Sequence, residues 1–130
     1  MIVSTSTPAA APAAAVRAQV QQAATLTAQA LDSWHGAMQP GLSLEEFSTL
    51  VSSGFRKVLD TQKLLGSALD DQEPGSTHDA IAGAAALVER ASSLAFCGLD
   101  GGGPVAVDLA LPALEGALGS LQQALGSMPD

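Results

Sequence analysis

The segment SLEEFSTLVSSGFRKVLDTQKLLGSAL, residues 43–69, carries the signals of a long amphipathic helix. Ser43 and Glu46 match a capping box, in which each side chain bonds the other residue's backbone amide. Acidic residues in the first turn also complement the helix dipole. Gly54 lies on the apolar face, where another helix can approach closely. That face recurs at helical spacing, with Gln62 as a polar interruption. Its residues are Phe47, Leu50, Val51, Phe55, Val58, Leu65 and Leu69.

The flanking segments predict two further helices. Upstream, a helix over residues 13–38 ends before Pro40-Gly41. Its apolar stripe, interrupted by Thr27, comprises Val16, Val20, Ala24, Leu31, Trp34 and Met38. Downstream, residues 70–75 predict a turn. A third helix should follow from a Ser76 or Thr77 cap to Cys97, with Gly98 as the glycine after its end. Its face comprises Ile81, Ala84, Ala85, Val88, Ser92 and Ala95.

A leucine stripe marks the fourth helix. It recurs at alternating four- and three-residue spacing, the pattern of a helix-packing face, and comprises Val107, Leu111, Leu114, Leu118, Leu121 and Leu125. Residues 100–104 are Asp-Gly-Gly-Gly-Pro and predict a flexible linker. Since proline suits the first turn of a helix and breaks an interior, the regular helix is expected to start at about Pro112. Gly116 and Gly119 lie away from the stripe.

Composition agrees with an all-α fold. The 130 residues include no Tyr, one Trp and three Phe, and much of the 47% hydrophobic fraction is Ala and Leu, which favour helix. Short connections between helices favour antiparallel neighbours. We therefore predict an antiparallel up-down bundle of four helices, forming one domain over residues 13–127. Residues 1–12, rich in small polar residues and proline, are expected to be a disordered tail.

The charge balance narrows the range of partners. With 13 acidic and 5 basic residues the net charge is −8, which opposes binding to nucleic acid and to anionic membranes. Arg56, Lys57 and Lys63 are near one another, but Asp60 lies among them, and we interpret them as a solvated face with an Arg56–Asp60 pair. No apolar run reaches the roughly 20 residues of a membrane span, so none is expected.

The composition of the N-terminus bears on the cellular location that we expect for the protein. It lacks the basic and Leu-rich regions of a Sec signal peptide, so we expect a cytoplasmic protein. The Ser/Thr-rich tail also resembles type III export signals. Secretion by a non-Sec route, as an effector or secretion-system substrate, is therefore the alternative hypothesis.

Several residues are of types that serve in catalysis or metal binding, but each has a simpler structural interpretation. Asp70, Asp71, Glu73, His78 and Asp79 offer hard oxygen ligands, but their spacing is not that of a calcium-binding loop, and Pro74-Gly75 explains a turn. Cys97, His35 and His78 are the only thiol and imidazoles, and an inert Cys97 is the favoured interpretation. Gly101-Gly102-Gly103 lacks the lysine of a phosphate-binding loop. We expect no enzyme activity and no cofactor; a small metal- or thiol-dependent enzyme is the remaining alternative.

Trp34-His35-Gly36 precedes the turn between the first two helices. This Trp-x-Gly resembles that of the small helical hairpins exported by type VII secretion systems, and the resemblance covers at most residues 13–69. It implies that Trp34 and Gly36 shape the turn. Six residues separate Gly36 from Ser43, more than that family usually has, and without Tyr the family's C-terminal export signal cannot exist here. The alternative is that Trp34 anchors the helix end in the core.

The leading functional hypothesis is a non-enzymatic protein–protein interaction module of the adaptor, chaperone-like or self-associating kind. Its partner would be another protein or a second copy, as in a homodimer. Helix-in-groove recognition uses anchors at the spacing of the leucine stripe. Those residues are therefore predicted to form either the bundle's core or a partner interface: Leu111, Leu114, Leu118, Leu121 and Leu125.

Overall fold

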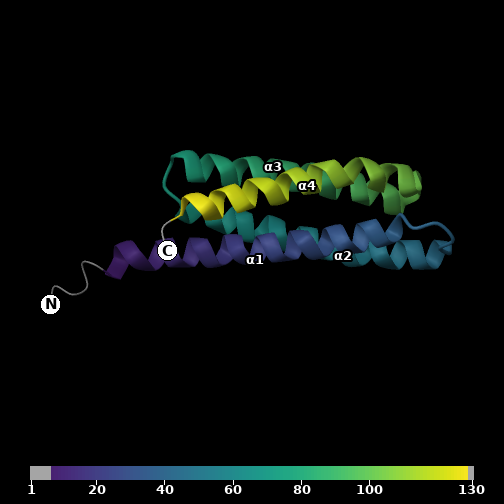
Figure 1. Cartoon of the computed structure of the whole chain (residues 1–130), viewed down its shortest axis with the longest axis horizontal. Coiled ribbons are helices and arrows are strands. Elements are labelled where there is room, and N and C mark those ends of the chain that lie inside the picture. The colour runs from purple at the N-terminus through teal and green to yellow at the C-terminus, as the bar shows by residue number, and fades with distance from the viewer. Residues whose placement is uncertain (1–6, 129–130) are drawn as a thin grey trace.

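The computed structural model describes residues 7–128, with side chains from residue 14 onward, as an antiparallel helical bundle (Figure 1). The described residues contain no β-strand, so the all-α prediction is confirmed. The elements are α1 (Thr7–Ala37), α2 (Leu44–Asp71), α3 (Ser76–Cys97), the π-helical turn η2 (Gly98–Gly102) and α4 (Gly103–Ser127). Helical backbone runs from α3 into η2 and is interrupted by a kink at Asp100 and Gly101, after which α4 begins, so α3 and α4 form one sharply bent segment. The bundle therefore has three helices when this segment is counted once, or four when its arms are counted separately.

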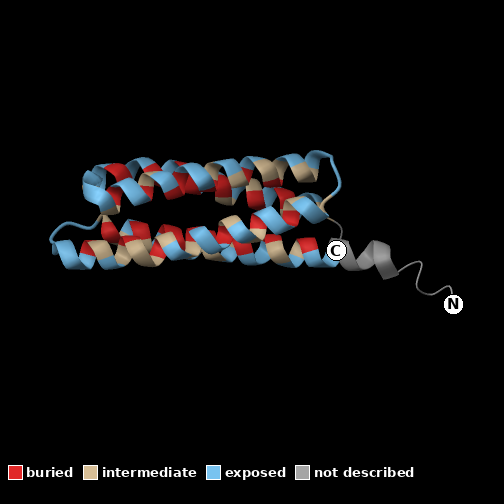
Figure 2. Cartoon of the chain, turned by 180° about the vertical axis from the view of Figure 1, so that it is seen from behind, coloured by how far each residue is buried: buried red, intermediate tan, exposed pale blue. Residues whose placement is uncertain are grey.

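The bundle consists of two helical hairpins, α1–α2 and α3–α4, packed against each other. Each helix contacts both of its neighbours, α1 touching α2 and α4, and α3 touching α2 and α4. Buried residues form a stripe along the inner side of each helix (Figure 2). Many of them are alanines, including Ala30, Ala84, Ala110 and Ala117, all fully buried. Small side chains allow neighbouring helices to approach closely.

Trp34 is the largest side chain that is fully buried, and it anchors α1 to α2. Its Nε1 donates a hydrogen bond to the backbone oxygen of Val51 at 3.1 Å. The indole lies directly over Gly54, where a β-carbon would come within 2.5 Å of Cδ1 of Trp34. Gly54 therefore provides the close approach that its position on the apolar face predicted.

Polar residues that interrupt the apolar stripes are satisfied within their own helices. Thr27 is buried, and its Oγ1 donates to the backbone oxygen of Ala23 at 2.7 Å. On α2 the buried polar residue is Thr61, whose hydroxyl donates to the oxygen of Lys57 at 2.9 Å. Gln62, the interruption expected from the sequence, is only half-buried. These hydrogen bonds remove most of the cost of burying a hydroxyl.

The boundaries of α1, α2 and α3 differ from the predicted ones. Helix α1 begins at Thr7 instead of residue 13; residues 1–6 of the predicted tail lie outside the described residues. Helix α2 continues to Asp71, two residues beyond the predicted end. The cap of α3 is Gly75, with φ 155°, rather than Ser76 or Thr77. The amide of Asp79 bonds the oxygen of Gly75 at 2.9 Å, so the first helical bond forms one residue earlier than the hydroxyl pattern indicated.

The chain reverses within the segment predicted as a linker, residues 100–104, where Asp100 and Gly101 have non-helical backbone angles. The linker is shorter than predicted, because α4 begins at Gly103. Helix α3 ends at Cys97 as predicted, and Gly98 follows it, but Gly98 keeps right-handed helical geometry and not the left-handed conformation usual for a glycine after a helix end. Its lack of a side chain serves packing, since a β-carbon there would lie 2.9 Å from Cγ2 of Val107. The positive φ values that turn the chain belong to Gly101 (109°) and Gly103 (63°).

Helix α4 starts at Gly103, nine residues before the predicted start at Pro112. Pro104 occupies the first turn, and Pro112 lies inside the helix. Pro112 is exposed, as is Asp108, whose carbonyl loses its usual amide donor. Water can bond that carbonyl, so the proline costs less here than on a buried face.

The buried face of α4 is rotated toward alanines relative to the leucine stripe. Leu111, Leu114 and Leu121 are buried, whereas Leu118 and Leu125 are half-buried against the core. The central positions between them belong to alanines that the prediction did not include: Ala106, Ala110, Ala113, Ala117 and Ala124. Helical spacing located three of the buried leucines, but the buried face also includes the alanines beside them.

The segment Ser76–Ser127 is also long and apolar enough, by length and composition, to cross a membrane, with 33% of its most apolar window buried in the bundle. A helix from the core of a bundle passes the same test. The expectation that the chain has no membrane span therefore stays a prediction.

Candidate functional site: a polar groove between α1 and α2

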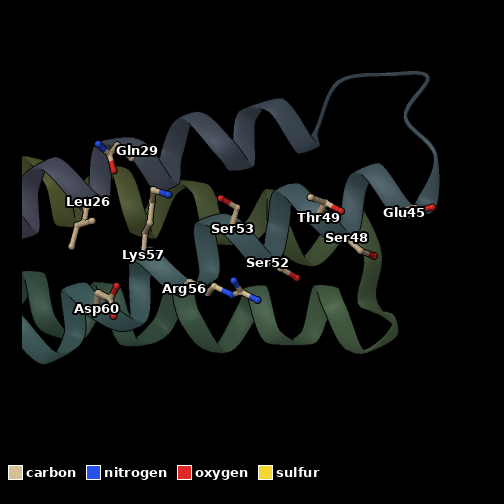
Figure 3. Close-up of a pocket in the computed structure, with 10 residues that line it drawn as sticks. All are labelled: Leu26, Gln29, Glu45, Ser48, Thr49, Ser52, Ser53, Arg56, Lys57 and Asp60. Atoms are coloured by element: carbon tan, nitrogen blue, oxygen red, sulfur yellow. The ribbon is translucent and has the colours of Figure 1, made fainter.

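An open groove of about 710 Å³ runs along the outer surface between α1 and α2 (Figure 3). Two of its lining residues come from α1 and the other eight from α2. The lining residues are Leu26, Gln29, Glu45, Ser48, Thr49, Ser52, Ser53, Arg56, Lys57 and Asp60. Apart from Leu26, every one of them has a polar side chain.

The sequence of α2 explains why this surface is hollow. The core face of α2 holds Val51, Gly54 and Val58, and the indole of Trp34 over Gly54 fixes how closely α1 lies to it. Beside that face, α2 carries only short hydroxyl side chains for two turns. Such side chains are too small to fill the valley between two helix surfaces, so an open groove remains.

Four hydroxyls line the middle of the groove, and the described residues provide no hydrogen-bond partner for any of their side chains. They are those of Ser48, Thr49, Ser52 and Ser53. This differs from the hydroxyls of Thr27 and Thr61, which bond backbone carbonyls in their own helices. A hydroxyl can both donate and accept, so the groove offers groups of both kinds to a ligand.

Arg56 and Lys57 place two of the chain's five basic residues beside these hydroxyls. The Arg56–Asp60 pair expected from the sequence is not formed: the Arg56 side chain extends away from Asp60 (Figure 3). Within the described part of the chain, neither cation has a carboxylate within ion-pairing distance. The acidic residues of the groove, Glu45 and Asp60, lie at its two ends along α2.

The residues predicted to form either the core or a partner interface lie elsewhere. The leucine stripe of α4 is part of the hydrophobic core or packs against it. Trp34 is likewise a core residue and contributes to the groove only by setting the distance between α1 and α2. The structure therefore does not bring the predicted site residues together on a free surface.

Residues considered for catalysis or metal binding are scattered. Cys97 is exposed at the end of α3, and His78 lies almost the whole helix away. Nε2 of His35 lies 3.8 Å from a carboxylate oxygen of Glu115, with both side chains more than half exposed. No group of three metal-ligating side chains occurs among the described residues, and those include the acidic turn at 70–75.

The groove was missed because its signal consists of small polar residues. Ser48, Ser52 and Arg56 are spaced four apart, as are Thr49, Ser53 and Lys57. This spacing puts them on one strip of α2. Taken alone, the cations Arg56, Lys57 and Lys63 are typical of a solvated face. The neighbouring run of hydroxyls, without long charged side chains among them, was the signal that could have indicated a groove.

Comparison with family models, with curated proteins and with solved structures finds no match to this chain. The resemblance of Trp34-His35-Gly36 to the type VII hairpins gains no support from them.

Proposed function

We propose that this protein is a non-enzymatic interaction module that holds a segment of another protein in the α1–α2 groove. The observation that carries the proposal is the groove itself, which hydroxyls and cations without partners in the described structure line together. Figure 3 shows Lys57, Thr49 and Ser53 pointing toward α1, and Arg56, Ser52 and Ser48 on the other side of α2. Polar groups that make no hydrogen bond within the fold are available to bond a ligand. When several of them line one groove, a single ligand can contact them together.

The chemistry of the lining favours binding over catalysis. A serine hydroxyl becomes a useful nucleophile only beside a general base, which is most often a histidine. The residues that line the groove include neither a histidine nor a cysteine. Arg56 and Lys57 can hold a ligand by charge, and the hydroxyls can orient it.

The burial of the leucine stripe moves the proposed interface away from α4. Leu114 and Leu121 are fully buried, so presenting them to a partner would require the bundle to open. The α1–α2 groove needs no such opening, because its residues are accessible in the folded chain. Rigid docking into a preformed groove avoids that conformational cost.

A groove-filling variant tests the proposal. Ser52→Trp places an indole in the middle of the groove, and Ser67→Trp places one on an exposed part of α2 outside it. Each tagged protein is incubated with extract of its native host, and retained proteins are quantified by mass spectrometry. We expect a set of proteins that wild type and Ser67→Trp retain and Ser52→Trp loses, with unchanged circular dichroism for both variants. Equal retention by Ser52→Trp would show that the groove is not the binding site.

A further inference from the structure

We infer that the groove takes an extended peptide segment with one or two acidic side chains, and this inference rests on the function proposed above. The first step is charge. Arg56 and Lys57 are adjacent in sequence and both line the groove, and no described carboxylate pairs with either. Lys57 points toward α1, and Arg56 extends along α2 on the side away from α1 (Figure 3). In a chain with 13 acidic and 5 basic residues, most surface positions repel an acidic ligand, and this position attracts one.

The second step is the shape of the ligand. The four hydroxyls lie along α2 beside the cations and have no described partner. A helical ligand satisfies its own backbone amides and carbonyls, so it gains little from such hydroxyls. An extended segment leaves those groups unpaired and can bond to the hydroxyls as both donor and acceptor. The lining therefore selects an extended segment.

The third step is the position of the acidic side chains within the segment. Ser48 and Arg56 are eight residues apart on α2, a rise of about 12 Å. An extended chain covers that length with about four residues. Glu45 lies beyond the hydroxyls at one end and Asp60 beyond the cations at the other. Because these carboxylates repel like charge, the ligand should carry a short acidic cluster at one end and neutral residues beyond it, and not a long acidic run.

An NMR titration of the whole labelled protein tests the inference with three peptides of the same neutral Gly/Ser sequence. One carries two adjacent glutamates near one end, the second has glutamines there, and the third has lysines. We expect the glutamate peptide to shift the amide signals of Ser48, Ser52 and Ser53, with an affinity about five-fold above that of the glutamine peptide. This factor corresponds to two exposed ion pairs of modest strength.

Two double variants separate local charge from total charge. Arg56→Glu/Lys57→Glu reverses the groove cations, whereas Lys63→Glu/Arg90→Glu makes the same change in net charge at exposed positions that do not line the groove. We expect the first to lose the preference for glutamate and to favour the lysine peptide, while the second retains the preference for glutamate.

Three outcomes would overturn the inference: equal affinity for the glutamate and glutamine peptides, equal loss in both double variants, or no shift in the groove with any peptide. Groove binding as such is judged separately by Ser52→Trp. If that variant loses partners while glutamate gives no advantage, the acidic preference fails and the proposed function stands.

Discussion

At Gly54, the indole of Trp34 occupies the space that a β-carbon would take. Adding a methyl group to a filled space costs about 1–3 kcal/mol. Replacing an interior helix glycine by alanine otherwise gains about 1 kcal/mol. We therefore expect Gly54→Ala to lower the free energy of unfolding by about 1 kcal/mol, measured by urea denaturation. The same substitution at Gly66 on α2, where a β-carbon meets no atom within 4 Å, should raise it by about 1 kcal/mol. A stabilising Gly54→Ala would contradict the packing of Trp34 over this glycine.

At the scale of the element, the start of α2 is fixed by its capping box. The amide of Glu46 donates to the Ser43 hydroxyl at 3.0 Å, and the Ser43 amide donates to a Glu46 carboxylate oxygen at 2.9 Å. The bond from the Ser43 backbone, followed by the one from its hydroxyl, lowers the pKa of Glu46 below the ordinary 4.5. A carboxylate with a lowered folded-state pKa contributes stability above its unfolded pKa and loses that contribution as pH falls through the folded value.

Glu46→Gln tests this pH dependence, because glutamine also fits a capping box but carries no charge. We expect wild type to be the more stable protein at neutral pH, and the difference in free energy of unfolding to shrink as the pH is lowered well below 4.5. Thermal denaturation of both proteins across that range measures it. A difference that stays constant with pH would mean that the charge of Glu46 does not strengthen the cap.

The helices and their ends were predictable from the sequence where interactions between residues close in the chain determine them. The Ser43–Glu46 cap of α2 and the helical periodicity of all four helices follow from short-range rules, and the structure contains them. The start of α4 was not predictable in that way. Pro112 is a strong helix breaker locally, but its exposed position on a packed helix lets water replace the lost bond. That compensation depends on which face of α4 lies inward.

At the scale of the whole molecule, the sequence predicted an antiparallel helical bundle but not its surface. The sequence predicted that the leucine stripe forms either the core or an interface, since both require the same apolar residues. Leu114 and Leu121 are fully buried in the core, whereas Leu118 and Leu125 are half-buried against it. The groove depends on how closely α1 and α2 approach, which Gly54 and Trp34 determine together. The distance between α1 and α2 cannot be inferred from the spacing of hydroxyl residues in the sequence. The groove could therefore be recognised only from the arrangement of the two helices.

The central claim is that the α1–α2 groove is the surface at which this protein binds a partner, and site-specific photo-crosslinking in the native host tests it most directly. A photoreactive amino acid replaces Ser53 in the groove or, as a control, exposed Gln122 on α4. We predict a defined adduct from position 53 and none from position 122, with the crosslinked partner peptide carrying an acidic cluster. The same adducts from both positions, or an adduct from position 122 alone, would contradict the claim.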